Sequence, residues 1–282
     1  MIIIKEISLL QKMLQQFKSV NKTIGFVPTM GALHSGHISL IKKSLDKDDI
    51  TVVSIFINPT QFNDSRDYEK YPVTLENDIL LLKQVKTSIL FLPPLYEIYP
   101  NGLESSFKYN LGFIETVLEG FYRPGHFQGV CRVVHKLLSI IQPDNLFMGQ
   151  KDYQQCMVIN KLIELYKIPA SLNIVPTERE STGLAMSSRN MRLSGHAKQK
   201  AVNIYKALNF IKNNLATIPL QQLKAEASKT LMNAGFQKID YIEICDAKTL
   251  MPVKEYDGKT KLVALAAAFI EDVRLIDNLL LN

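Results

Sequence analysis

Short runs of β-forming residues alternate with helical patterns over most of this chain of 282 residues. Runs rich in Val, Ile, Leu and Phe recur at 23–29, 51–58, 88–93, 145–149 and 171–177. Helical patterns lie between these runs, after Gly36, near 75–86, after Pro124 and from Lys151. This alternation is typical of a parallel sheet covered by helices. The N-terminus adds one more strand followed by an amphipathic helix.

The alternation stops at a polar segment, residues 178–194. Beyond it, helical patterns at about 195–214 and 219–234 precede three candidate strands near 238–245, 261–269 and 273–280. Helices followed by successive strands predict a small α+β domain on an antiparallel sheet. We therefore expect two domains, residues 1–180 and residues 181–282, with the second serving as a cap or lid.

Charge and cysteine usage narrow the class of protein. The chain carries 33 Lys and Arg against 27 Asp and Glu, a net charge of +6. The basic residues are dispersed without a basic-aromatic patch, which favours small anionic ligands over nucleic acid. Charged residues interrupt the apolar N-terminus before membrane-span length, so we expect no membrane insertion. Three widely separated cysteines argue against a disulfide framework and favour a cytoplasmic protein.

The first cluster with chemical meaning is PTMGALHSGH, residues 28–37, between an apolar run and a helical pattern. Gly31 and Gly36 allow the backbone to approach a ligand closely, and the helix N-terminus offers N–H groups to phosphates. His34 and His37 could contact the phosphates of ATP and stabilise charge on a departing pyrophosphate. The alternative is a glycine-rich turn with two exposed histidines.

The second cluster is Met186-Ser187-Ser188-Arg189, within the polar segment. Two hydroxyls and a guanidinium on a mobile loop can close over a triphosphate, with Arg189 donating charge-assisted hydrogen bonds. An early HxGH motif with a late Ser and basic loop resembles the class I nucleotidyltransferases.

Two further clusters follow predicted strands, at the carboxyl edge where α/β sheets bind ligands. In GQKDYQQ, residues 149–155, Lys151 is a point charge suited to a phosphate, and Asp152 could accept from a ribose hydroxyl. Its alternative reading is a helix start with Asp152 in the first turn. In NPTQF, residues 58–62, Gln61 can both donate and accept, as recognition of a hydroxy acid requires.

Five motifs together resemble the pantothenate synthetase family: PTMGALHSGH, NPTQF, RPGHFQGV, GQKDYQQ and GLAMSSRN. The resemblance is strong over about 24–195 and weaker elsewhere. It implies an α/β fold with a Rossmann-like parallel-sheet domain and a smaller C-terminal α+β domain. It also implies a cytoplasmic homodimer that condenses (R)-pantoate with β-alanine. The reaction would use ATP and Mg²⁺, pass through a pantoyl adenylate, and release AMP and pyrophosphate.

The resemblance also implies residue roles. The expected catalytic residues are His34, His37, Lys151 and Arg189. Pantoate or β-alanine would be bound by Asn58, Gln61 and Gln155. The nucleotide would be bound by Met30, Gly31, Ala32, Leu33, His34, Ser35, Gly36, His37, Gly149, Gln150, Lys151, Asp152, Glu178, Met186, Ser187, Ser188 and Arg189.

Some positions depart from the family pattern. Glu178 stands where the family commonly has a valine that gives backbone contacts to adenine, and a main-chain contact tolerates that change. Val73 stands where an arginine is customary. For magnesium, Asp78 is the candidate ligand; the alternatives are that Asn77 occupies the ligand position or that phosphates and waters hold most of the ion.

Other functions are also compatible with these motifs. An adenylyltransferase would use the same nucleotide motifs, but Gln61 and Gln155 together favour a second substrate. An aminoacyl-tRNA synthetase is disfavoured because roughly 90 residues after the loop leave little for an anticodon-binding domain. A catalytically silent nucleotide- or RNA-binding protein would explain the glycine-rich turns but not the histidines, lysine and Ser-Arg loop. His126 is expected to order the start of a helix, with contact to substrate as the alternative.

Overall fold

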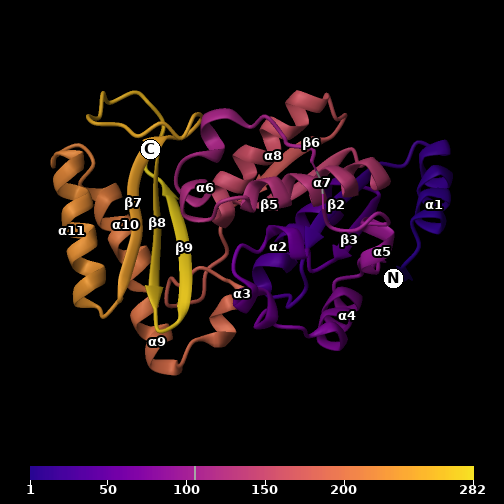
Figure 1. Cartoon of the computed structure of the whole chain (residues 1–282), viewed down its shortest axis with the longest axis horizontal. Coiled ribbons are helices and arrows are strands. Elements are labelled where there is room, and N and C mark those ends of the chain that lie inside the picture. The colour runs from indigo at the N-terminus through magenta and orange to yellow at the C-terminus, as the bar shows by residue number, and fades with distance from the viewer. Residues whose placement is uncertain (105) are drawn as a thin grey trace. The chain divides into compact units, whose positions relative to one another are not determined.

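The computed structural model describes residues 1–104 and 106–282, and the chain divides into two compact units (Figure 1). The first unit comprises Met1–Gly149 and Gln155–Pro176. The second comprises Gln150–Gln154 and Thr177–Asn282. Five residues after Gly149 thus belong to the second unit, although the residues on either side of them belong to the first.

The first unit contains a parallel sheet of six strands in the order β1-β4-β3-β2-β5-β6. All five strand pairings are parallel, for example Phe26 with Val52 on one side and with Leu146 on the other. The strands are β1 (Ile2–Ile4), β2 (Ile24–Thr29), β3 (Ile50–Ile55), β4 (Ile89–Phe91), β5 (Asn145–Gly149) and β6 (Ser171–Val175). The parallel α/β fold expected from the alternating sequence is confirmed.

Helices connect these strands. The longer ones are α1 (Ile7–Ser19), α2 (Ser35–Lys47), α4 (Leu75–Gln84), α7 (His126–Ile141) and α8 (Tyr153–Tyr166). Short ones are α3 (Ser65–Glu69), α5 (Leu95–Ile98), α6 (Glu119–Tyr122) and the 3₁₀ turns η1 (Pro59–Gln61) and η2 (Gly112–Glu115).

Both faces of the parallel sheet are covered, because successive strand residues point to opposite sides. Phe26 and Val52 pack in a core with residues of α1, α7 and α8. Their neighbours Val27 and Val53 pack in a second core with residues of α2 and α4. The continuous apolar runs of the central strands therefore reflect burial on two faces.

The strand order places a topological switch point between β2 and β5. From β2 the chain proceeds to β3 and then β4, and afterwards returns to the other side of β2 to form β5. In open α/β sheets, ligands bind outside the carboxyl ends of strands at such a point. Residues 30–37, which follow β2, and Gly149, which ends β5, occupy this edge of the sheet.

The second unit contains an antiparallel sheet in the order β7-β8-β9. Its strands are β7 (Lys238–Asp246), β8 (Leu262–Ile270) and β9 (Val273–Leu280). Its helices are α9 (Gly195–Ala201), α10 (Asn203–Asn213) and α11 (Leu220–Asn233), with the 3₁₀ turns η3 (Gln150–Asp152) and η4 (Ser188–Arg192). Helices α10 and α11 lie beside the sheet (Figure 1) and share its apolar core, in which Leu208, Leu223 and Leu265 are buried. The expected α+β arrangement is confirmed.

Two predicted helices differ from those observed. The helix expected over about 195–214 is divided at Val202 into α9 and α10. There the Asn203 side chain donates to the carbonyl of Lys200 at 2.8 Å, so a side-chain amide competes with the backbone for that acceptor. The helix expected from Lys151 begins as the 3₁₀ turn η3 and becomes α-helical at Tyr153.

The three cysteines, Cys131, Cys156 and Cys245, are free and buried. Burial raises the pKa of the Cys131 and Cys245 thiols to about 12. Over the part of the chain that the structure describes, no helix is long and apolar enough to cross a membrane.

Candidate active site

The turn that follows β2 is held in an unusual backbone conformation. Gly31 has φ +79° and Ala32 has φ +49°, so two successive residues lie in the left-handed region. An alanine there costs about 1–2 kcal/mol relative to ordinary backbone. Thr29 supports the turn, since its hydroxyl donates to Ser54 O at 2.7 Å and accepts from Gly31 N at 3.2 Å. The turn allows α2 to begin only a few residues after the strand ends.

Asp78 is the main restraint on this turn. Its carboxylate, only 1% exposed, accepts from the backbone N–H groups of Ala32 at 2.9 Å and Leu33 at 2.8 Å. The Thr74 hydroxyl donates to it at 3.0 Å. Both oxygens thus accept hydrogen bonds from the protein's own groups, and these contacts do not support the predicted role of Asp78 as a magnesium ligand.

The two histidines of the first motif form a capping pair at the N-terminus of α2. His34 Nδ1 accepts from Gly36 N at 3.2 Å, and His37 Nδ1 accepts from His34 N at 3.3 Å. The ring centroids are 4.1 Å apart. Because Nδ1 of each ring accepts a hydrogen bond, each neutral imidazole carries its proton on Nε2. The structure therefore brings the predicted histidines together, with a defined tautomer.

Gln61 and Asn58 lie after β3, which neighbours β2. The Gln61 amide nitrogen contacts Met30 Sδ at 3.1 Å, which joins the NPTQF segment to the first motif. Asn58 is 1% exposed, and its amide donates to Gln61 Oε1 at 3.0 Å and to Gly129 O at 3.1 Å. Its oxygen accepts from the Tyr99 hydroxyl at 2.8 Å. Asn58 therefore orients Gln61, and these contacts do not support the predicted direct contact of Asn58 with substrate.

His126 supports the same segment from α7. As expected, it starts that helix, and it is buried. Its Nδ1 lies 2.8 Å from Gln61 O and its Nε2 lies 3.1 Å from the Arg123 guanidinium. Gln155 is in the first turn of α8 and partly buried.

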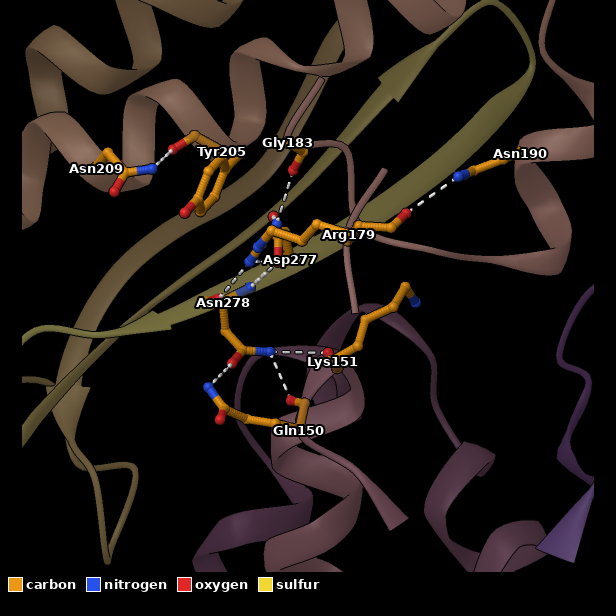
Figure 2. Close-up of polar contacts among 10 residues, drawn as sticks. Gln150, Lys151, Arg179, Gly183, Asn190, Tyr205, Asn209, Asp277 and Asn278 are labelled. Carbon is orange, nitrogen blue, oxygen red and sulfur yellow. Dashed lines mark hydrogen bonds and ion pairs between the residues drawn. The ribbon is translucent and has the colours of Figure 1, made fainter. Parts of the chain in front are cut away.

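In the second unit, Lys151 lies in η3 with its side chain 17% exposed. Its ammonium is 3.9 Å from Asp152 Oδ1. The carbonyls of Gln150 and Lys151 both accept from the side-chain amide of Asn278, each at 2.8 Å (Figure 2). The backbone of Lys151, the predicted phosphate-binding residue, is thus held by a side chain of strand β9.

The predicted polar loop begins as a hairpin. Arg179 and Ala185 pair as an antiparallel bridge, and Met186 N donates to Glu178 O at 2.9 Å. Gly183 closes the hairpin with φ +96°, and a Cβ there would lie 2.7 Å from the Tyr205 ring. Ser187 then caps η4 by accepting from Arg189 N at 3.2 Å. Glu178 and the predicted Ser-Arg segment are therefore linked through the backbone.

Three residues of this region were not predicted from the sequence: Arg179, Asp277 and Asn278. The Arg179 guanidinium donates to Asp277 Oδ2 at 2.6 Å and Oδ1 at 2.9 Å. Burial raises the pKa of Asp277, and Arg179 opposes that shift. No local pattern reveals these contacts, because the partners are 98 and 99 residues apart.

The geometry of the first unit is typical of a nucleotide-binding enzyme. A helix N-terminus follows the strand beside the switch point, and it presents two imidazoles whose protons are on Nε2. Helix N-termini favour anions, and N–H donors stabilise charge that develops on phosphate oxygens.

Comparison with known proteins gives the family. Residues 2–280 match the sequence model of a family described as "Pantoate-beta-alanine ligase". A pantothenate synthetase of Cytophaga hutchinsonii is 44% identical over 283 residues, covering 100% of this chain and 99% of the relative. This chain therefore belongs to the pantoate-beta-alanine ligase family.

Solved structures agree with this assignment. The crystal structure of pantothenate synthetase from Thermus thermophilus matches with a TM-score of 0.92 at 34% identity, covering 99% of both chains. A pantoate-beta-alanine ligase from Francisella tularensis, complexed with "Beta-gamma ATP" and β-alanine, matches with a TM-score of 0.81 at 39% identity. That match covers 99% of this chain and 97% of the other.

Proposed function

We propose that this chain carries out the reaction of its family, the ATP-dependent condensation of (R)-pantoate with β-alanine to pantothenate, with release of AMP and pyrophosphate. The observation that carries the proposal is the histidine pair at the N-terminus of α2, on a turn that Asp78 holds beside the switch point. The Francisella relative complexed with an ATP analogue and β-alanine supports the choice of substrates.

The chemistry requires activation of the acid. A carboxylate is a poor electrophile for an amine, because its leaving group would be an oxide. Attack by the pantoate carboxylate on the α-phosphorus of ATP breaks the bond to pyrophosphate and forms a mixed anhydride, pantoyl adenylate. The free amine of β-alanine then attacks the acyl carbon, AMP leaves with the anhydride oxygen, and the amine loses a proton.

His34 and His37 act on the first of these steps. Each neutral ring carries its proton on Nε2, and that N–H is the group proposed to donate to the phosphate oxygens. Negative charge on those oxygens grows as pyrophosphate departs, so the donors bind the transition state more tightly than the ground state. The N-terminus of α2 adds a favourable dipole for the same charge.

Lys151 and Arg189 are the proposed cationic groups. Lys151 supplies a compact ammonium for phosphate, and Arg189 supplies a planar fork of donors. Ser187 and Ser188 lie beside Arg189, and Glu178 precedes the hairpin that leads to them. We assign nucleotide binding to these residues and adenine contacts to the backbone at Glu178. The other residues that the family resemblance implies as nucleotide-binding are proposed to bind ATP as well.

Gln61 and Gln155 are the proposed pantoate ligands. Gln61 is held from two sides, by the Asn58 amide and by contact with Met30. A fixed amide can donate to the carboxylate and accept from a hydroxyl of the substrate. Asn58 is then a positioning residue for Gln61.

Magnesium is assigned to the nucleotide rather than to the protein. Over residues 1–104 and 106–282, no group of three or more His, Cys, Asp or Glu side chains could hold a metal ion. The carboxylate of Asp78 accepts the backbone N–H groups of Ala32 and Leu33. Magnesium that accompanies ATP would therefore be held by phosphate oxygens and water.

A homodimer is the proposed assembly. Large apolar side chains recur at exposed positions between residues 95 and 122, and exposed apolar surface of this kind favours a protein interface. They include Leu95, Tyr96, Leu103, Phe107, Phe113, Phe121 and Tyr122.

Light scattering after size exclusion should give a dimer mass, and Phe121→Asp should shift it toward the monomer. A wild-type monomer at micromolar concentration would contradict the proposal.

A product assay tests the reaction itself. Pantoate, β-alanine and ATP are supplied together and then omitted one at a time, while AMP, ADP and pantothenate are measured. The proposal expects AMP and pantothenate in equal amounts, only when all three are present. AMP transfer to a second nucleotide or phosphopantetheine instead would identify an adenylyltransferase, and ATP binding without turnover would identify a silent binding protein.

A further inference from the structure

Two consecutive residues of strand β9, Asp277 and Asn278, connect segments that are distant in sequence. Both are buried, with 5% and 2% exposed surface. Asp277 pairs with Arg179, while the amide of Asn278 reaches the carbonyls of Gln150 and Lys151 (Figure 2). One point of β9 therefore fixes both η3 and the start of the 179–185 hairpin.

The Arg179 guanidinium is held on several sides. Besides its two bonds to Asp277, Nη1 donates to Gly183 O at 3.1 Å and Nη2 to Asn278 O at 3.4 Å. Its Cζ lies 3.8 Å from the centroid of the Tyr205 ring. A bidentate ion pair with an aromatic platform fixes both the position and the plane of a guanidinium. The backbone of Arg179, and with it the adjoining Glu178, is thereby restrained.

The Asn278 amide is fully committed. Its nitrogen has two hydrogens, and it lies 2.8 Å from Gln150 O and 2.8 Å from Lys151 O. Its oxygen accepts from Gln150 Nε2 at 3.3 Å. Two successive carbonyls held by one rigid amide fix the peptide groups on both sides of the Lys151 Cα, and so the direction in which the Lys151 side chain leaves the backbone.

We propose that Asn278 is a positioning residue for Lys151, and that Asp277, acting through Arg179, is a positioning residue for Glu178. The proposal rests on the function assigned above, in which Lys151 contacts phosphate and the backbone at Glu178 contacts adenine. Neither Asp277 nor Asn278 touches a substrate in this scheme. They act by fixing the backbone that carries the residues that do.

A purely stabilising role has a different signature. Buried ion pairs contribute little net stability compared with well-packed apolar residues, because desolvation offsets their attraction. Loss of a positioning residue, in contrast, should be felt only while the residue that it positions is present. Coupling between the two sites, rather than the size of either effect, therefore distinguishes the two roles.

The test is a double-mutant cycle on Asn278→Ala and Lys151→Ala. Each single variant is expected to lower kcat at least about tenfold. The double variant should be within about twofold of Lys151→Ala, because the residue that Asn278 positions is already gone. Multiplication of the two single losses in the double variant would overturn the proposal. If Asn278→Ala fails to fold, Asn278→Ser, whose shorter side chain offers one hydroxyl donor in place of the amide, replaces it in the same cycle.

Asn214→Ala is the matched control. The Asn214 amide also donates to a backbone carbonyl of the second unit, Phe210 O at 2.8 Å, but the bond lies at the end of α10. It should leave kcat within about twofold of wild type, although it removes a bond of the same kind. An equal loss of kcat in Asn214→Ala would assign the Asn278 effect to general stability and overturn the proposal.

The second arm uses Arg179→Lys, which keeps the charge but loses the fork that grips Asp277. Because Glu178 is assigned to adenine, this variant should weaken ATP binding about tenfold and reduce discrimination between ATP and GTP, with a smaller change in kcat. If Arg179→Lys lowers kcat but leaves the discrimination between ATP and GTP unchanged, the proposed positioning role of Asp277 is refuted.

The same double-mutant cycle is also measured on ATP binding by calorimetry, so that the reaction and the positioning roles are tested separately. If the wild type does not catalyse the ligase reaction, the proposed function is refuted. If Asn278→Ala and Lys151→Ala lower ATP affinity additively in the double variant, the positioning roles are refuted.

Discussion

Removal of the Asp78 carboxylate should damage catalysis through the backbone rather than through magnesium. Asp78→Ala leaves the N–H groups of Ala32 and Leu33 without their acceptor in a site where the aspartate is 1% exposed. Each buried N–H that loses its partner costs about 1–3 kcal/mol. Together with the lost bond from Thr74, we expect a fall of about 3–7 kcal/mol in the free energy of unfolding.

The effect on the reaction follows from the strain in the turn. Ala32 has φ +49°, a conformation that costs about 1–2 kcal/mol and that the Asp78 bonds help to hold. Without them the turn relaxes, and His34, two residues further on, is displaced. Misplacement of a catalytic group by about 1 Å costs on the order of a hundredfold in rate. We therefore expect Asp78→Ala to lower kcat about a hundredfold, and Asp78→Asn, which keeps one oxygen acceptor, to lower it less.

The assay measures kcat, the magnesium concentration for half-maximal rate, and unfolding in denaturant. The control is Glu76→Ala, because Glu76 is an exposed carboxylate in the same first turn of α4. The half-saturating magnesium concentration should stay within about twofold of wild type in every variant, since Asp78 binds N–H groups. A tenfold rise in that concentration with unchanged unfolding would refute this reasoning and restore Asp78 as a metal ligand.

Three other outcomes are expected. His34→Ala and His37→Ala should each slow pantoate-dependent pyrophosphate exchange at least about a hundredfold with circular dichroism unchanged, and a rate close to wild type would make that histidine structural. Lys151→Ala should cost at least about tenfold in kcat and Lys151→Arg should recover little, because a planar fork does not replace a compact ammonium; full activity in the arginine variant would refute this. Burial holds the pKa of Cys131 and Cys245 at about 12, and Cys156 is buried as well. A thiol reagent at pH 8 should therefore modify none of the three cysteines until denaturant is added, and rapid labelling of the native protein would contradict the buried assignment.

Most of the first unit could be predicted from sequence because its signals are local. An apolar strand such as 24–29 is buried on both faces, and the amphipathic period of 126–141 repeats within a single element. Strand order is less accessible. Nothing in residues 2–4 indicates that they pair with 89–91, because that pairing depends on how the whole sheet assembles.

The candidate site was predictable where motif and chemistry coincide, and less so where burial decides the role. The pairing of His34 with His37 follows from their spacing at a helix start. Asp78, by contrast, has the pattern of an acid in the first turn of a helix, which gives no sign that its carboxylate reaches the N–H groups of residues 32 and 33. The role of Asn58 was equally hard to predict, since the sequence does not reveal that its amide donates to Gln61 and Gly129.

Contacts from the C-terminal strand could not be predicted at all. Asp277 and Asn278 belong to a segment, RLIDN, with an ordinary strand pattern. Their partners Arg179, Gln150 and Lys151 lie about 100 or more residues earlier in the chain. Long-range polar pairs of this kind carry no periodicity, so they appear only in the folded structure.

The most direct test of the central claim follows the oxygen atoms of pantoate. Pantoate labelled with ¹⁸O in its carboxylate is converted with ATP and β-alanine, and the nucleotide and phosphate products are analysed by mass spectrometry. If the acid is activated as its adenylate, one labelled oxygen bridges carbon and phosphorus and remains on AMP when the amine attacks. The account therefore predicts one ¹⁸O in AMP and none in pyrophosphate. Label in inorganic phosphate, with ADP as the nucleotide product, would show an acyl phosphate route and contradict the adenylate mechanism.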